Sequence, residues 1–370
     1  MQQDRKPFRM MTAGPVNVTQ TVKQSLIYPE MGHREPEFEE LYAEVREKLL
    51  KVFGVDPKKY SPFVIGGSGT AAMESVLSSI VHRGKKMLVI NNGAFGDRIS
   101  EICSVYGIPT LKTHCQWGEY PDLYGIERMV IQELDIEAVS MVFMETSTGM
   151  VNPVREVGEI CRRHNRMFAV DAVSGLAGDP LNIEESGVDF CLSNTNKGLS
   201  GLPVISFVLA KKNSVEKIKD IPERNYYLSL LKHIKYAEQN QTPFTPQIPL
   251  FFMLRQALDE LLEEGIENRI NRYRENSSLM RKRLGEIGFK FQLPEKYMSN
   301  VMTNVLIPSN YDYEEFHTHL REKGHIIYPG KGPLEGKVMH IGNVGTSTTK
   351  EVNGFCDAVS QIVKERRIQY

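Results

Sequence analysis

Cysteine is scarce in this sequence. Its 370 residues include five cysteines, at positions 103, 115, 161, 191 and 356, with no C-x-x-C pair and no cysteine–histidine cluster. This spacing excludes a disulfide framework and a structural zinc site, and no metal site is predicted. Because free thiols persist in reducing compartments, we expect the protein to be cytoplasmic.

An excess of charge and long apolar runs are also missing. Lys and Arg number 45 against 46 Asp and Glu, which gives a formal net charge of −1. No whole-molecule field therefore favours nucleic acid or an anionic membrane. No apolar run could cross a bilayer, and the charged residues 1–11 do not resemble a signal peptide. We expect neither a nucleic-acid nor a membrane partner.

What the sequence does contain is an alternation of apolar strands with helices. Continuous apolar segments such as 86–90, 136–145 and 204–210 alternate with amphipathic ones. This pattern predicts an α/β fold with a mainly parallel sheet covered on both faces. After about Pro249 come long, charge-laced helices and short strands, typical of a smaller α+β domain. We predict an N-terminal segment over 1–20, a large domain over 21–255 and a small domain over 256–370.

Polar or glycine-rich turns follow five of the apolar strands: GGSGT, NNGAFG, TSTG, DAVS and SNTNK. Because ligands gather at the carboxyl ends of parallel strands, we expect these turns to form one site. In the first, backbone N–H groups with Ser68 and Thr70 predict a phosphate site. The turn also fits a dinucleotide pattern, but Asn91 and Asn92 stand where the ribose-binding acid is expected. A helix N-cap is the remaining alternative.

Lys197 is the only charged side chain between Asp189 and Lys211. An amine in a pocket of low dielectric has a lowered pKa, which a Schiff-base lysine requires; the alternative is a buried structural ion pair. Asp171, after another apolar strand, either faces a cation or caps a turn. Phosphate turn, buried acid and isolated lysine together supply the three fixed points that pyridoxal phosphate needs.

Several motifs resemble those of one family in order and spacing. TAGPVNVT, GHREPEFEELY, ETSTGMVNPV, VDAVSG, SNTNKGLSGLP and HIGNVG are similar to segments of the class V, fold-type I aminotransferases. The resemblance implies a large domain with a mainly parallel seven-stranded sheet and a smaller C-terminal α+β domain. ETSTGM, NK, YPGK and IGNVG look most like 2-aminoethylphosphonate:pyruvate transaminases. GHREPEF looks more like the alanine:glyoxylate and serine:pyruvate enzymes.

The resemblance also implies roles at pyridoxal 5'-phosphate. Lys197 would form the Schiff base, and Asp171 would hold the pyridine nitrogen protonated. The other implied cofactor residues are Ser68, Gly69 and Thr70 at the phosphate, Phe95 on the ring, Thr148 near the phenolic oxygen, and Ser193 and Asn196 along the pocket. Thr245 would reach the phosphate of a partner subunit, so a homodimer with a shared active site is implied.

One position departs from the family pattern. Where family members carry an arginine before the final IG, this sequence has His340, in VMHIGN. Histidine offers one bond and a titratable charge, whereas arginine binds an oxyanion with two parallel bonds. Arg34 and Lys331 are the candidate replacements, and Gly14 completes the residues implied at the substrate.

The resemblance implies a transaminase that moves an amino group from a small amine, with preference for a phosphonate or phosphate amine, to a keto acid such as pyruvate. The alternatives are an alanine or serine aminotransferase acting with glyoxylate or pyruvate, a lyase of the same fold, and a non-catalytic binding protein. A desulfurase would need a reactive cysteine on a loop, whereas Cys356 falls in a predicted helix.

Overall fold

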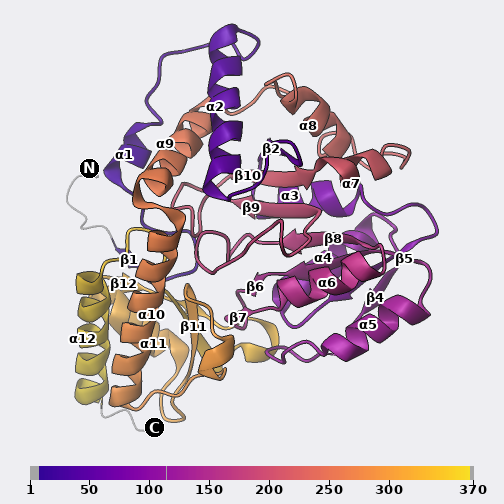
Figure 1. Cartoon of the computed structure of the whole chain (residues 1–370). Helices are drawn as coiled ribbons and strands as arrows, with labels where there is room; N and C mark the ends of the chain where they lie inside the picture. The colour runs from indigo at the N-terminus through magenta and orange to yellow at the C-terminus, as the bar shows by residue number, and fades with distance from the viewer. Residues whose placement is uncertain (1–7, 114, 367–370) are drawn as a thin grey trace.

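The computed structural model describes residues 8–113 and 115–366, and its centre is a seven-stranded sheet (Figure 1). The strand order is β2-β10-β9-β8-β5-β3-β4. The strands are β2 (Tyr60–Gly66), β3 (Lys86–Ile90), β4 (Thr110–Lys112), β5 (Ile136–Val142), β8 (Met167–Asp171), β9 (Phe190–Asn194) and β10 (Ile205–Lys211). The predicted mainly parallel seven-stranded sheet is confirmed, with β10 antiparallel to both of its neighbours.

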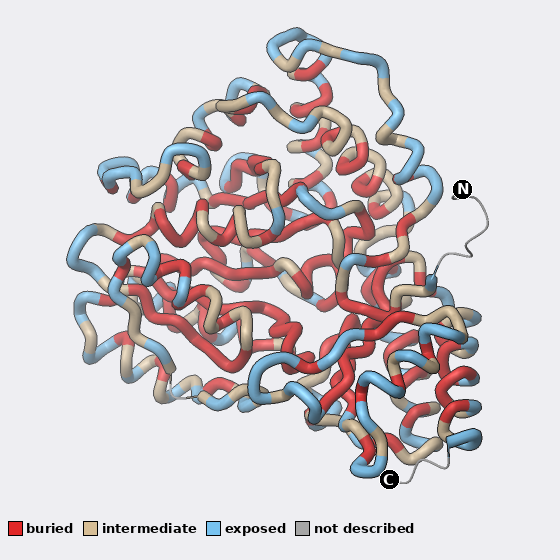
Figure 2. Tube along the Cα trace, turned by 180° about the vertical axis from the view of Figure 1, so that it is seen from behind, coloured by how far each residue is buried: buried red, intermediate tan, exposed pale blue. Residues whose placement is uncertain are grey.

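The sheet is covered on both faces. Every residue of β8 and β9 is buried, and the strands form a continuous buried layer in Figure 2. Strands of this kind lack the polar alternation of a half-exposed sheet, because neither set of side chains meets water. The turns at their carboxyl ends are therefore the places where polar groups can gather.

Nine helices of the described chain precede or surround this sheet. They are α1 (Gln20–Gln24), α2 (Pro36–Val52), α3 (Gly69–Leu77), α4 (Ala94–Val105), α5 (Leu123–Gln132), α6 (Val154–Arg163), α7 (Lys212–Lys217), α8 (Leu230–Ala237) and α9 (Ile248–Glu264). Helices α2 and α9 pack together through Phe38, Tyr42 and Phe251, whose ring centroids lie 5.2 to 6.1 Å apart. Pro36 starts α2 because a first-turn proline has no N–H to leave unpaired.

The C-terminal elements build a second, smaller core, coloured orange to yellow in Figure 1. They are α10 (Ile266–Ile287), η1 (Glu295–Tyr297), β11 (Met302–Leu306), α11 (Tyr313–Glu322), β12 (His325–Ile326), β13 (Tyr328–Pro329), η2 (Gly332–Leu334), β14 (Val338–Gly342) and α12 (Thr349–Arg366). Strands β11, β14 and β13 form an antiparallel sheet.

The N-terminal segment contributes to both cores. β1 (Arg9–Met10) pairs with β12, and Met11 belongs to the smaller core, whereas Val16 and Val18 belong to the larger one. The domain boundaries given above stay a prediction. No described helix is apolar and long enough to cross a membrane.

Candidate active site

Lys197 lies in the turn that follows β9. Backbone bonds from Ser200 N to Lys197 O (2.9 Å) and from Gly201 N to Thr195 O (2.8 Å) close this turn tightly. The lysine side chain then runs against Gly14, whose φ is +147°. A Cβ at Gly14 would lie 2.5 Å from Lys197 Cδ. Any residue other than glycine would therefore clash with the lysine side chain.

The environment of Lys197 favours its neutral form. Burial and the positive charge of Lys331 lower the pKa of Lys197 to about 8, against the attraction of Asp171. Among residues 8–113 and 115–366, no acidic side chain forms an ion pair with Lys197. The structural ion pair considered above is therefore not formed in the described chain, and the amine faces a cavity.

Asp171 is the last residue of β8. It is buried, and its Oδ1 accepts a hydrogen bond from Val173 N at 2.9 Å. Burial raises the pKa of Asp171 to about 6, while that bond and the charges of Arg98 and Lys197 act in the opposite direction. The bond from Val173 N is the turn cap considered above, and a carboxylate buried in this setting would also be stabilised by a cationic partner.

The glycine-rich turn between β2 and α3 has free donors. Ser68 is the N-cap residue of α3, yet its side chain makes no capping bond. Ser68 therefore occupies the N-cap position that the alternative expected, but its side chain does not cap α3. A Cβ at Gly69 would lie 2.6 Å from Val173 Cγ2, which shows how closely this turn approaches the chain after Asp171. Arg98 Nη1 donates to Thr70 Oγ1 at 3.4 Å and brings a positive charge to the turn.

A cavity of about 320 Å³ lies beside Lys197, and neither Asp171 nor residues 68–70 belong to its walls. Its walls are Ala13, Gly14, Phe95, Thr146, Ser147, Lys197, Met302, Tyr328, Pro329, Lys331 and His340. Two cations lie close to the Phe95 ring: Arg98 Cζ at 4.6 Å and Lys331 Nζ at 5.7 Å from its centroid. Lys331 forms no ion pair with an acid of the described chain, so its charge is available to a ligand.

His340 lines the same cavity without carrying a charge. Only 4% of the residue is exposed, and its Nε2 lies 3.1 Å from Ser147 O, so that nitrogen is the donor. Burial is the main cause that lowers the pKa of His340 to about 4, and Lys331 adds to it. At neutral pH the family's arginine is thus replaced by a neutral imidazole bound to the protein itself.

Some predicted residues are not in the cavity wall. Arg34 is exposed and donates to Gln241 Oε1 and Thr242 O, and Thr245 is exposed nearby. Thr148 is fully buried, with its hydroxyl 3.4 Å from Glu145 O. Ser193 is buried and donates to Ala172 O at 3.3 Å.

Asn196, in contrast, presents a buried Oδ1 that has no hydrogen-bond partner within the described chain. The same is true of Asn194 Oδ1. Such orphaned buried oxygens are costly unless a ligand satisfies them. Cys356 is fully buried in α12, and burial raises the pKa of its thiol to about 11, which argues against a desulfurase.

Sequence reasoning missed four residues at the site: Arg98, Glu145, Thr146 and Ser147. Three of them stand in the motif ETSTG, where Glu145 is predicted to end a strand and TSTG to form the turn after it, and this pattern does not show which side chains face inward. Arg98 stands on α4, two residues after the turn NNGAFG, and no local signal distinguishes it from a solvated arginine.

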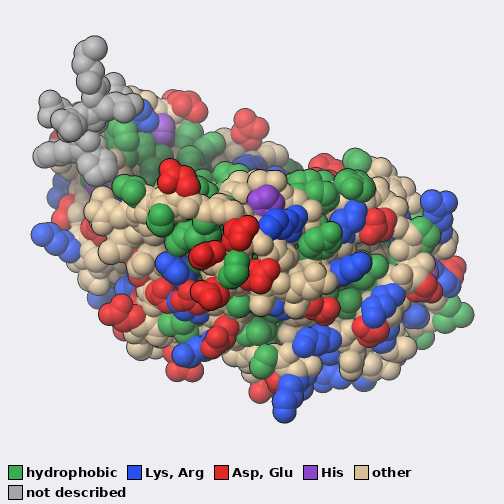
Figure 3. Space-filling model, turned by 90° about the horizontal axis from the view of Figure 1, so that it is seen from above, with side chains coloured by type: hydrophobic (Ala, Val, Ile, Leu, Met, Phe, Trp, Pro, Cys, Tyr) green, Lys and Arg blue, Asp and Glu red, His purple; other side chains and the backbone are tan. Residues whose placement is uncertain are grey.

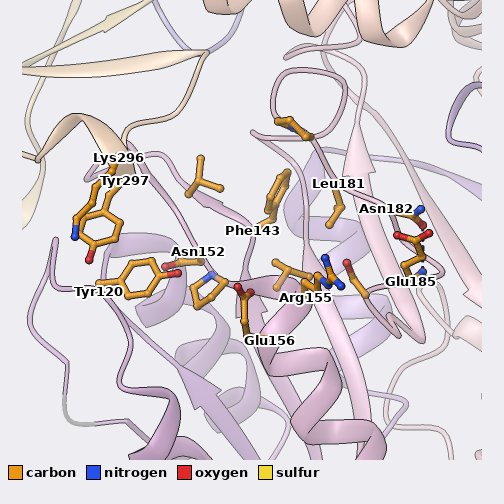
Figure 4. A pocket seen from close by; sticks show the side chains of 15 residues that line it. Tyr120, Phe143, Asn152, Arg155, Glu156, Leu181, Asn182, Glu185, Lys296 and Tyr297 are labelled. Atoms are coloured by element: carbon orange, nitrogen blue, oxygen red, sulfur yellow. Dashed lines mark hydrogen bonds between the residues drawn. The ribbon is translucent and has the colours of Figure 1, made fainter.

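A second hollow, of about 420 Å³, lies away from Lys197, between η1 and the start of α6. Figure 4 shows Tyr120 and Tyr297 at one end and Asn182 and Glu185 at the other. Its charged side chains are of both signs, and it shares none of the residues discussed above. Acidic and basic groups are likewise both spread over the face seen in Figure 3. The described residues contain no cluster of three or more metal-ligating side chains.

Comparisons with known proteins agree with this geometry. The family model described as aminotransferase class-V matches residues 17–335. An uncharacterized aminotransferase of Methanocaldococcus jannaschii is 34% identical over 96% of this chain and 92% of its own. A 2-aminoethylphosphonate–pyruvate transaminase of Lysinibacillus sphaericus is 31% identical over 95% and 96%. The crystal structure of an alanine–glyoxylate aminotransferase from Nostoc sp. superposes with a TM-score of 0.91 at 28% identity, covering 98% of this chain and 97% of that one.

Proposed function

The chain belongs to the class V aminotransferases, and from that premise we propose that it moves an amino group from a small phosphonate or phosphate amine to a keto acid such as pyruvate. The protein is an aminotransferase of fold type I, and its cofactor is pyridoxal phosphate. The substrate and the role of each residue are our proposal.

The residues present fit this cofactor. Ser68, Gly69 and Thr70 offer free donors at a helix start, where a phosphate binds well. The orphaned Oδ1 of Asn196 gives a polar group that a ligand would satisfy. When bound, pyridoxal phosphate supplies an aldehyde for the amino group and a cationic ring that takes up the electron pair released at the substrate carbon.

The chain's own groups then have distinct tasks. Asp171 would hold a proton on the ring nitrogen, because a buried carboxylate gains most from a cation beside it. Lys197 would carry the proton between the substrate carbon and the cofactor, because an amine whose pKa is lowered to about 8 can accept a proton near neutral pH. Phe95 would cover one face of the ring and exclude water.

Our proposal for how the substrate oxyanion is recognised rests on one observation. Apart from Lys197, Lys331 is the basic side chain of the described cavity wall that has no acidic partner in the described chain, and His340 in the same wall is neutral. An ammonium attracts an oxyanion as a compact point charge and needs no paired geometry. Relatives named for 2-aminoethylphosphonate support a phosphonate as that oxyanion.

A second candidate is transfer from alanine or serine to glyoxylate or pyruvate. It is favoured by the likeness to the alanine–glyoxylate aminotransferase, at 28% identity over nearly the full length. A carboxylate would use the same Lys331, so the cavity alone does not separate the two substrates.

A half-reaction screen tests the proposal. Holoenzyme is mixed separately with 2-aminoethylphosphonate, L-alanine and L-serine, and the absorbance of the bound cofactor is followed. We expect the phosphonate amine to convert the cofactor fastest, and pyruvate to restore the starting spectrum. Faster conversion by alanine or serine would establish the second candidate instead.

The control for this screen is Lys197→Ala, which we expect to convert no substrate while still binding the cofactor. Release of ammonia or an aldehyde without recovery of the spectrum by any keto acid would show lyase chemistry and contradict the substrate proposal. Conversion by Lys197→Ala at the wild-type rate would contradict the assignment of the proton carrier.

We also propose that the enzyme is a homodimer with a shared active site and works in the cytoplasm. The exposure of Thr245 on one chain supports the first, because the resemblance assigns this residue to the phosphate of a partner subunit. The second is supported by five cysteines that are all free thiols, as is typical of a reducing compartment.

A further inference from the structure

We propose that Glu145 is a positioning residue that fixes the wall carrying Phe95 to the turn carrying Ser147. Glu145 ends β6 (Met144–Glu145), which pairs with β7 (Met150–Val151) in a short hairpin. Nothing in the catalytic scheme above uses this side chain. It is nevertheless fully buried, with 0% of the residue exposed.

The carboxylate of Glu145 accepts four hydrogen bonds, two at each oxygen. Oε1 accepts from Ser147 N at 3.1 Å and from Ser147 Oγ at 2.5 Å. Oε2 accepts from Phe95 N at 3.1 Å and from Gly96 N at 3.2 Å. The two sides of the carboxylate therefore join residues about fifty positions apart in the chain.

These bonds complete the start of α4. The helix has no capping side chain of its own, because its N-cap is Gly93. Ala94 N donates to Ser147 Oγ at 2.9 Å, and the next two N–H groups donate to Glu145. The turn at 145–147 thus takes the place of an N-cap, and the negative charge suits the helix N-terminus.

The chemistry of the contacts requires a carboxylate. All four partners are N–H or O–H donors, and an ionised carboxylate is a pure acceptor with room for four. Glutamine in its place would turn an NH₂ group toward two of these donors. Burial, with the charge of Asp171 adding to it, raises the pKa of Glu145 to about 7, although the bonds from Ser147 and Gly96 oppose that rise.

Gly93 independently supports this role, because its lack of a side chain makes room for Glu145. A Cβ at this residue would lie 2.3 Å from Glu145 Cγ and 2.6 Å from Ser147 Oγ. The backbone at Gly93 is extended and any residue could adopt it. The glycine is therefore needed for the space that the Glu145 side chain fills, and not for its conformation.

The consequence reaches both sides of the cavity. Phe95 forms one wall, and Ser147 O accepts from Asn304 Nδ2 at 2.8 Å and faces His340 Nε2 at 3.1 Å. Displacing Glu145 should therefore shift the Phe95 ring and, through Ser147, weaken the contact that holds His340. The effect would be on how the cofactor is held, whichever amine is the substrate.

The test compares Glu145→Gln with Asp189→Asn, without substrate. Asp189 is a buried carboxylate that accepts from Phe168 N (2.9 Å) and Ser214 Oγ (2.6 Å), but it precedes β9, at the opposite end of the strand from Lys197. We expect Glu145→Gln to weaken pyridoxal phosphate binding about tenfold or more and to change the visible circular dichroism of the bound cofactor. Asp189→Asn should lower the melting temperature but leave both cofactor readouts unchanged.

Gly93→Ala is the second variant, because its methyl group displaces the carboxylate without removing it. It should reproduce the circular-dichroism change, and Glu145→Asp should restore part of the affinity lost in Glu145→Gln. Wild-type affinity and dichroism in both Glu145→Gln and Gly93→Ala would overturn the proposal. If Glu145→Gln does not fold, Gly93→Ala decides alone by the same two readouts.

Discussion

At the scale of single residues, our proposal rests on the pair His340 and Lys331, which would determine how an oxyanion is held. The neutral imidazole of His340 already donates to Ser147 O, so it has no proton and no charge to offer. Lys331 has both, and it has no acidic partner in the described chain. Under our proposal, the role that the resemblance gives to one arginine would thus fall on a flexible ammonium, which orients its ligand less strictly.

The variant Lys331→Met tests whether Lys331, and not His340, binds the oxyanion. Removing a charge-assisted hydrogen bond costs about 1.5 to 3 kcal/mol, so KM for the oxyanionic amine should rise by roughly tenfold to a hundredfold, with a smaller change in kcat. Lys337→Met is the matched control, because Lys337 is an exposed lysine of the same C-terminal segment that does not line the cavity. Steady-state kinetics with the amine identified by the screen measures both variants.

His340→Arg in the Lys331→Met background gives the reciprocal test. An arginine at 340 would return a charged, bidentate donor to the cavity wall. We therefore expect the raised KM of Lys331→Met to fall part of the way back toward the wild-type value. An unchanged KM in Lys331→Met, together with no gain from His340→Arg, would show that the oxyanion is bound elsewhere.

At the scale of elements, the packing of α2 on α9 anchors the large core. Phe251 of α9 is 2% exposed and meets both Phe38 and Tyr42 of α2 edge to face. Such aromatic pairs add to the apolar area that they bury. The adjacent Phe252 points to the other side of α9, where it is partly buried and stacks on Tyr28 at 5.1 Å.

Phe251→Ala should therefore destabilise the fold far more than Phe252→Ala. Truncating a buried phenylalanine costs about 3 to 5 kcal/mol, because a cavity remains, whereas Phe252 can give up part of its contacts to water. Urea denaturation followed by circular dichroism measures both free energies of unfolding. Equal losses would contradict the two-sided packing described for α9.

The elements also show what sequence could and could not predict. The strands β3, β8 and β9 could be predicted because each is a short, continuous apolar run between turns. Such a run is stable only as a strand that is buried on both faces. The single strand predicted over 136–145 was wrong at its end. The chain leaves the sheet after Val142, and Phe143 N donates to Asp171 O. The antiparallel direction of β10 was not predictable, since an apolar run has the same pattern in both directions.

The site was predictable to the extent that turns at the carboxyl ends of parallel strands must converge. That rule brought Lys197, Asp171 and the GGSGT turn together without any structure. It could not identify Glu145, whose partners on α4 become neighbours only through the pairing of β3 with β5. It also gave no orientation for Thr148, which the structure buries with its hydroxyl directed at Glu145 O.

At the scale of the whole molecule, one chain leaves an apolar edge beside the phosphate turn. Val204 O accepts from Gly67 N at 2.9 Å, yet the Val204 residue is 56% exposed. Its φ of +79° is strained for a β-branched residue. Tyr226, which is 73% exposed, lies against Phe244, next to Thr245. In the proposed dimer, the partner subunit would cover this exposed valine and the exposed aromatic beside Thr245.

We therefore expect the holoenzyme to sediment as a dimer, and Val204→Lys to shift it to monomer at micromolar concentration. A lysine beside the phosphate turn should by itself favour phosphate binding. A loss of cofactor affinity in this variant would thus come from the missing partner residues and not from local charge. Val105→Lys is the control, since Val105 is 82% exposed at the end of α4 and should leave the dimer intact. A wild-type monomer that binds pyridoxal phosphate tightly would contradict the shared active site, because Thr245 would then have no phosphate to reach.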